Sequence, residues 1–291
     1  MATGFPVEAQ GKSVEASVIR SFINILHSCC AHGAAALLMG RWYALRRAQA
    51  IRAIEKKHHT RVITMIHRQE KRSLFGFAVS RHIDLEDAQT VIAAIKETPD
   101  DTPIDLIIHT PGGLVLAAMQ IERAVEAHPA KVTAYVPVYA MSGGTLIALA
   151  ADEIVMGEFS VLGPIDPQIL GLPAASIVRA RDSKPVADVF DLTLVLADVG
   201  EKAVAQVKQG AIELMTPRLD QSAAEAIAEK LTGGYWTHDY ALTATEAKAL
   251  GLPVKVGMPL EVMEFMMLYP QPIRQSGVEY LPIDAPRQRR V

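Results

Sequence analysis

Two glycine-marked turns constrain the fold of this chain most. HTPGG (His109–Gly113) follows the apolar run IDLIIH, and AMSGG (Ala140–Gly144) follows KVTAYVP; a helix-like segment comes after each turn. Continuous apolar runs of this length are typical of buried parallel strands, and short connections to helices place successive strands in one sheet. We therefore expect an α/β fold with both turns at the carboxyl ends of neighbouring strands, where the sites of such folds form.

The same alternation of strand-like and helix-like segments runs along most of the chain. β-branched and apolar runs predict strands, and acidic starts followed by apolar residues at helical spacing predict helices. We expect strands at 61–67, 103–110, 131–137 and 152–156, and helices from about 84, at 114–128, after 142, over much of 177–230, and within 236–252.

The N-terminal region differs from this pattern. Residues 14–57 are rich in Ala, Leu and Arg and favour a long helix, so we divide the chain into a helical arm, 1–57, and a catalytic-type domain, 58–291. An uncharged run at 22–40 has the length of a membrane span, but Asn, His, Ser and Gly dilute it. It is a candidate for a membrane anchor, a contact with a partner subunit or a core helix. If it spans, the following RWYALRR leaves the domain in the cytoplasm.

Charge and cysteine usage exclude several classes of function. The 291 residues carry a formal net charge of -3, so no basic field favours nucleic acid as a partner. The two cysteines, Cys29 and Cys30, are adjacent, which argues against a mutual disulfide and favours a reducing compartment. No spaced Cys/His set and no Walker loop is present, so we expect neither a metal nor a nucleotide cofactor.

The turn that ends in Gly112 and Gly113 has the composition of an anion-binding turn. Pro111 has no backbone donor, whereas the two glycines supply N–H groups and adopt backbone angles closed to other residues. At a helix start such N–H groups aim at one point, which is how an oxyanion hole is built. The plain alternative is a tight strand–helix turn.

Ser142 is the one polar side chain at the second turn. Its two following glycines would let another group approach the hydroxyl closely, although Ala140 breaks the G-x-S-x-G elbow. The alternative role is the N-cap of a buried helix. Two glycine-marked turns in successive strand–helix units favour the nucleophile.

A nucleophilic serine needs a base. Of the nine histidines only His238 follows Ser142. A desolvated lysine can also serve, and Lys184 stands out because Pro185 disfavours helix at that position. We expect the lysines in charged helical stretches to be solvated: Lys202, Lys208, Lys230 and Lys248.

These segments resemble the serine dehydrogenase proteinase family, a branch of the ClpP/crotonase superfamily related to signal peptide peptidase A. The resemblance rests on VITMIHRQE, IDLIIHTPGG, VYAMSGGTLIALAADEIVM, LGPIDPQI, WTHDYALTATEAKALGLPV and LYPQP. It implies a spiral of ββα units, an oxyanion hole at Gly112 and Gly113, and a nucleophile at Ser142.

The base departs from the Clp-type pattern, because SVLGPIDPQIL contains no histidine. This stretch is similar to the Ser–Lys peptidases, whose lysine follows the serine at a distance comparable to that of Lys184, 42 residues on. Lys184 is therefore our expected base, and His238 and Lys202 are the alternatives. Asp166 either orients a partner or is structural.

We thus expect a Ser–Lys endopeptidase that acts on peptide or protein substrates, with Gly112, Gly113 and the amide of Gly143 stabilising the oxyanion. It would form a homo-oligomer in the cytoplasm or at the cytoplasmic face of the inner membrane. Two rivals remain: a crotonase-type acyl-CoA enzyme, and a non-catalytic oligomeric scaffold at the membrane.

Overall fold

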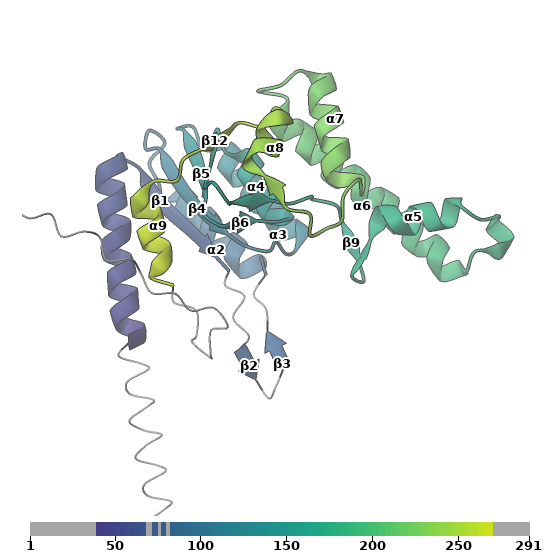
Figure 1. Cartoon of the computed structure of the whole chain (residues 1–291), viewed down its shortest axis with the longest axis horizontal. Coiled ribbons are helices and arrows are strands. Elements are labelled where there is room, and N and C mark those ends of the chain that lie inside the picture. Colours follow the sequence, from purple (N-terminus) through teal and green to yellow (C-terminus); the bar gives the residue numbers. More distant parts are fainter. Residues whose placement is uncertain (1–38, 68–71, 75–76, 80–81, 270–291) are drawn as a thin grey trace, which may run out of the picture. The chain divides into compact units, whose positions relative to one another are not determined.

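The computed structural model describes residues 39–67, 72–74, 77–79 and 82–269 (Figure 1). The chain divides into two compact units, 1–53 and 54–291, and a helix over residues 39–58 crosses that boundary. Nearly all of the uncharged run at 22–40 lies outside the described residues, as does the first part of the expected helical arm. Within the described ranges no helix is long and apolar enough to cross a membrane.

A five-stranded parallel sheet forms the centre of the second unit. Its strands follow the order β1-β4-β5-β7-β12. Their bounds are β1 (Arg61–Ile66), β4 (Ile104–His109), β5 (Val132–Val136), β7 (Glu153–Met156) and β12 (Val254–Val256). All six residues of β4 are buried, which is why its sequence is apolar without alternation. The four expected strands are confirmed, and β12 is an edge strand that the sequence pattern missed.

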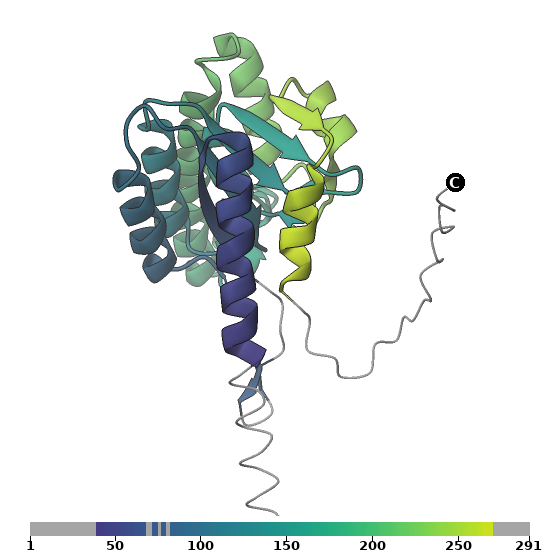
Figure 2. The same ribbon diagram turned by 90° about the vertical axis from the view of Figure 1, so that its left-hand side faces the viewer.

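Helices cover both faces of this sheet, as Figure 2 shows: α2 and α3 lie on one side and α9 on the other. Leu106 and Ile108 of β4 belong to the main core cluster, whereas Ile107 between them faces the opposite side. The bounds are α2 (Leu85–Lys96), α3 (Val115–Glu126), α4 (Gly143–Ala150) and α9 (Leu260–Met267).

The start of α2 follows from its first residues. The Asp84 carboxylate accepts hydrogen bonds from the N–H groups of Glu86 and Asp87, and the Asp87 carboxylate accepts one from the Asp84 N–H. This reciprocal cap satisfies amides that a helix start leaves without partners. The expected start of this helix at about residue 84 is therefore confirmed.

A second, three-stranded sheet lies beside the first, in the order β11-β8-β6. Its strands are β6 (Tyr139–Ala140), β8 (Val161–Leu162) and β11 (Leu242–Thr243), and α8 (Ala244–Ala249) follows β11. Along the chain β5, β6 and α4 form one ββα unit, the unit that the family resemblance implied. Two short hairpins complete the strands: β2 (Arg72–Leu74) with β3 (Phe77–Val79), and β9 (Gln168–Ile169) with β10 (Leu172–Pro173).

The expected helical region at 177–230 is present but interrupted. It comprises α5 (Ala174–Asp182), the 3-10 turn η1 (Val186–Asp188), α6 (Asp191–Met215) and α7 (Gln221–Thr232). The break comes at Pro185, which disfavours helix at the residue before it. In Figure 1, α5 and the first part of α6 extend away from the sheet. The last part of α6 buries Ala211 and Leu214 in the core.

Candidate active site

The two glycine-marked turns lie against each other, as expected for the carboxyl ends of adjacent strands. Thr110 and Ala140 form an isolated bridge, in which the Met141 N–H donates to the Thr110 carbonyl oxygen at 2.9 Å. A Cβ atom placed on Gly112 would lie 2.8 Å from the Cβ of Ser142. Gly112 also has a φ of +101°, so this position requires glycine for two independent reasons.

Ser142 occupies a backbone conformation that is rare for a residue with a side chain. Its φ is 50° and its ψ is -118°, and its hydroxyl makes no capping hydrogen bond to α4. The N-cap role considered above is therefore not the one the structure shows. Non-glycine residues in such conformations concentrate at functional sites, where the surrounding structure holds the strain.

Ser142 opens into a cavity of about 330 Å³. Its polar lining comes from Ser142, Asp166, Gln168, His82 and His238. Apolar side chains from three helices and one loop form much of the remaining wall: Val115, Ala118, Leu146, Ile165 and Val207. The cavity therefore combines a hydroxyl, an imidazole and a carboxylate with an apolar surface, as small-molecule and peptide sites commonly do.

His238 and Asp166 form a hydrogen-bonded pair in this cavity. The distance from His238 Nδ1 to Asp166 Oδ1 is 2.8 Å, and the Asp166 side chain is 1% exposed. The other Asp166 oxygen, Oδ2, accepts a hydrogen bond from Gln168 Nε2 at 2.7 Å. With Nδ1–H donating to Asp166, Nε2 of a neutral His238 is a proton acceptor. The hydrogen bond to Asp166 raises the pKa of His238, and partial burial opposes that rise.

The two lysine candidates lie elsewhere. Lys184 is exposed in the turn between α5 and η1, and it is not among the residues that line the Ser142 cavity. In this conformation Lys184 therefore lacks the burial that a lysine base needs to lose its proton. The Lys202 side chain is 67% exposed and forms an ion pair with Asp198 at 2.5 Å. A base role for Lys184 stays a prediction.

Backbone donors at the two turns differ in what they already bind. The Gly112 N–H donates to the Thr110 hydroxyl oxygen at 3.2 Å. In the described part of the chain, the N–H groups of Gly113 and Gly143 have no hydrogen-bond acceptor. The Gly113 nitrogen lies 3.8 Å from the point where a Cβ on Gly143 would stand, so these two amides are neighbours.

Sequence reasoning missed two features of this site. It named His238 and Asp166 separately, 72 residues apart, and did not pair them. It also gave no role to Thr110, which bonds to both turns. The signal available for Asp166 was its place between two prolines in GPIDPQ, a rigid turn directly after β8.

Comparisons with known proteins identify the family of this chain. The profile of the ClpP-like SDH-type serine proteinases matches residues 20–290. Uncharacterized proteins MJ0137 and MJ1495 of Methanocaldococcus jannaschii are 51% and 48% identical to this chain, covering 82% and 84% of it and 84% of each relative. Membrane protein NfeD1b of Bacillus subtilis is 29% identical over 55% of this chain and 35% of its own length.

Among solved structures, two mutants of the 1510-N membrane-bound stomatin-specific protease are similar, one of them in complex with a substrate peptide. They are 20% and 22% identical, with TM-scores of 0.42 and 0.41. The matches cover 63% and 62% of this chain and 79% and 74% of theirs. The family profile covers nearly the whole chain and confirms the resemblance drawn from its motifs: this chain belongs to the ClpP-like SDH-type serine proteinases.

Proposed function

We propose that the chain is a serine endopeptidase in which Ser142 is the nucleophile and His238, oriented by Asp166, is the general base. The observation that carries this proposal is the shared cavity: a serine in a strained turn and a hydrogen-bonded His–Asp pair line the same space of about 330 Å³. A nucleophile, a base and a group that orients the base are the three parts that acyl transfer to serine needs.

The reaction follows from these roles. His238 Nε2 takes the proton from the Ser142 hydroxyl as Ser142 Oγ attacks the carbonyl carbon of the substrate. The tetrahedral intermediate then expels the amine, which receives that proton from His238, and leaves an acyl-serine. Water, deprotonated by His238 in turn, hydrolyses the ester and frees Ser142.

Gly113 and Gly143 are the proposed donors to the oxyanion. Their N–H groups are neighbours at the starts of α3 and α4 and have no acceptor within the described residues. Gly112 is not a proposed donor, because its N–H already donates to the Thr110 hydroxyl oxygen. Its positive φ shapes the turn that aims Gly113 at the carbonyl oxygen.

Lys184 remains the rival base, as the Ser–Lys resemblance predicts. A lysine in water keeps its proton up to pH ~10, so Lys184 could act only after it leaves solvent and comes close to Ser142. His238 needs no such rearrangement, since it already lines the cavity.

The apolar wall of the cavity indicates the kind of peptide that binds. Val115, Leu146 and Val207 offer a surface without charge. We propose that this wall takes an apolar side chain of the substrate next to the cleaved bond.

The domain division of the chain follows its change of pattern near residue 57. We propose 58–291 as the peptidase domain and 1–57 as an arm that contacts a membrane or another copy of the chain. The similarity to NfeD1b, a membrane protein of Bacillus subtilis, supports the membrane contact. A location at the cytoplasmic face of a membrane and a homo-oligomeric state complete the proposal.

A serine-directed probe tests the function. Purified full-length protein is treated with a fluorophosphonate, the labelled residue is identified by mass spectrometry, and hydrolysis of quenched peptide libraries is measured in parallel. We expect covalent labelling at Ser142 and loss of hydrolysis on labelling. Absence of both would favour the non-catalytic scaffold, and hydrolysis of acyl-CoA thioesters instead of peptides would favour the crotonase-type enzyme.

A further inference from the structure

We infer that Asp87, His67 and Thr110 form a positioning chain that holds the oxyanion turn, so that the three side chains act on the reaction without touching the substrate. The inference rests on the proposed function, because it concerns the amides assigned to the oxyanion. It adds Asp87, which lies outside the family motifs, and it gives a role to His67 and Thr110, which do not line the Ser142 cavity.

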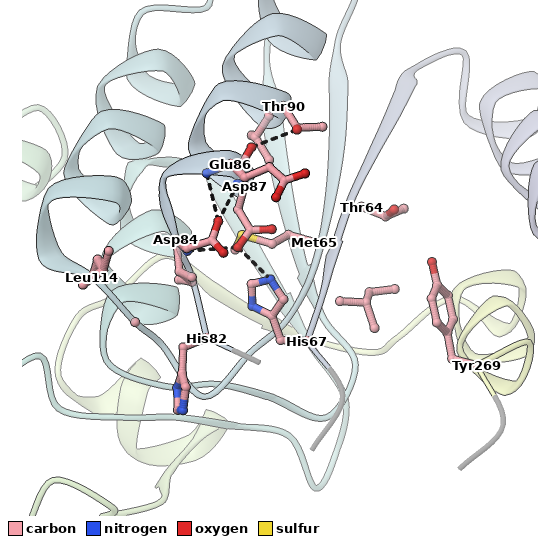
Figure 3. Close-up of a pocket in the computed structure, with 14 residues that line it drawn as sticks. Thr64, Met65, His67, His82, Asp84, Glu86, Asp87, Thr90, Leu114 and Tyr269 are labelled. Atoms are coloured by element: carbon pink, nitrogen blue, oxygen red, sulfur yellow. Dashed lines mark hydrogen bonds and ion pairs between the residues drawn. The ribbon is translucent and has the colours of Figure 1, made fainter. Parts of the chain in front are cut away.

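The positioning chain consists of one close contact between an imidazole and a carboxylate, followed by two hydrogen bonds. His67 directly follows β1, and its Nε2 lies 3.2 Å from Asp87 Oδ2 in the first turn of α2. Its Nδ1 lies 2.8 Å from the Thr110 hydroxyl oxygen, which in turn accepts the Gly112 N–H at 3.2 Å. Figure 3 shows the His67 ring directed at Asp87, with a dashed line between them.

With Asp87 ionised and His67 neutral, the chemistry of the groups allows one direction for these contacts. An ionised Asp87 only accepts, so His67 Nε2 carries the proton, and Nδ1 of the neutral ring is an acceptor. The Thr110 hydroxyl therefore donates its one hydrogen to Nδ1, which leaves a lone pair for the Gly112 N–H. Each member thus sets the orientation of the next, from α2 to the oxyanion turn.

Thr110 contacts both turns of the site. It is fully buried, and its backbone binds the second sheet through Tyr139 and Met141. Its Cγ2 methyl lies 2.4 Å from the point where a Cβ on Gly144 would stand. Thr110 is therefore packed between the turn of Gly112 and the start of α4, and its hydroxyl has no room to turn freely.

His67 and Asp87 also border a second cavity, of about 770 Å³ (Figure 3), which shares His82 and Gly113 with the Ser142 cavity. The positioning chain therefore lies at the Gly113 side of the site. His67 is buried, and partners at both ring nitrogens offset its loss of water and hold the ring in one orientation. The group it holds is the hydroxyl that binds Gly112.

Two substitutions of His67 separate its contact with Asp87 from its contact with Thr110. The side-chain amide of Asn stands where Nδ1 stands, and that of Gln reaches the place of Nε2. His67→Asn keeps a partner for Thr110 and loses Asp87, whereas His67→Gln keeps Asp87 and loses Thr110. Thr110→Val and Thr110→Ser form a second pair, since only serine retains the hydroxyl.

Kinetics give the first readout. A displaced oxyanion donor lowers the rate of the chemical step, so we expect kcat to fall by about 10- to 100-fold in His67→Gln and Thr110→Val, with KM nearly unchanged. His67→Asn and Thr110→Ser should retain most of the wild-type kcat. Equal kcat in both members of each pair, or a loss confined to KM, overturns the inference.

Amide exchange gives a second readout that does not depend on peptidase activity. Hydrogen–deuterium exchange resolved by NMR should show Gly112 exchanging about tenfold faster in His67→Gln and Thr110→Val than in the matched variants. Unchanged exchange at Gly112 overturns the inference even in a protein that hydrolyses nothing. Failure of the proposed function would instead appear as an absence of labelling at Ser142 in the wild type.

Discussion

The cavity around Ser142 and the turn around Lys184 were both expected to carry catalytic groups, and they differ in almost every physical respect. Ser142 sits in a strained turn beside buried glycines and a hydrogen-bonded His–Asp pair. Lys184 is exposed beside Pro185, between α5 and η1. The first region has its groups fixed by two sheets, whereas the second is a turn between two helical segments that belongs to neither sheet.

This difference shows which kind of sequence inference is strong. The position of Ser142 follows from local order, a strand, a turn and a helix within a few residues. The position of Lys184 was inferred from its distance along the chain and from the proline after it. Neither property specifies burial, and a lysine base needs burial before it can lose its proton at neutral pH.

Replacing the nucleophile should give the largest effect. Ser142→Ala removes one hydroxyl from a small-residue turn, so folding should persist while peptide hydrolysis falls by at least ~10³-fold. Ser183→Ala, which changes an exposed serine next to Lys184, is the matched control and should keep full activity. Steady-state hydrolysis of a quenched peptide measures both variants. Substantial activity in Ser142→Ala would show that Ser142 is not the nucleophile.

Replacing the base comes next and compares the two regions directly. His238→Gln should lower kcat by roughly 10²- to 10⁴-fold, as loss of a general base does. Lys184→Arg keeps the charge of a surface residue and should leave kcat unchanged, whereas Lys202→Arg serves as a second neutral control. If Lys184→Arg abolishes activity and His238→Gln spares it, the Ser–Lys mechanism is correct and the turn that carries Lys184 must move towards Ser142.

The pH dependence of activity gives an independent test of the same assignment. Only neutral His238 accepts a proton, and its hydrogen bond to Asp166 raises its pKa. Activity should therefore rise with pH through a midpoint above the ordinary histidine value of about 6.5. Asp166→Asn removes the carboxylate that stabilises protonated His238, so it should move that midpoint to lower pH. If the midpoint is the same in Asp166→Asn, a group other than His238 causes the rise of activity with pH.

Much of the fold could be predicted from the sequence, but only part of the site. The strands at β1, β4, β5 and β7 have long apolar runs, so their pattern identified them. β6 and β8 each have two residues and carry no periodic signal, yet they form the sheet that supports the Ser142 turn. The pairing of His238 with Asp166 needs contacts between segments distant in the chain, which no local pattern records.

The apolar wall of the cavity should control which peptides are cleaved. Val207 of α6 lines the cavity and is 4% exposed, whereas Val199 on the same helix is 47% exposed. Val207→Trp should lower kcat/KM about tenfold or more for substrates with large apolar residues, with a smaller effect for small ones. Val199→Trp is the matched control. A uniform loss across all substrates would indicate that the wall does not contact the side chain next to the cleaved bond.

The smallest effect on activity should come from a buried carboxylate that the reaction does not use. Glu122 and Glu126 lie on α3. Glu122 is 5% exposed, and its Oε2 atom has no hydrogen-bond partner among the described residues, whereas Glu126 is exposed. Burial raises the pKa of Glu122 to about 7. In the unfolded chain the Glu122 carboxyl has its ordinary pKa of 4.5. Between these values the folded state binds one more proton, so stability falls as pH rises towards 7.

Glu122→Gln removes this loss, because glutamine does not ionise. The variant should be more stable than wild type by ~1–3 kcal/mol above pH 7 and nearly equal to it below pH ~4, while kcat stays unchanged. Glu126→Gln should change stability little at any pH. Urea unfolding of all three proteins at several pH values measures these differences. A stability gain that does not depend on pH would show that packing around α3, and not the charge of Glu122, determines the difference between the buried and the exposed carboxylate.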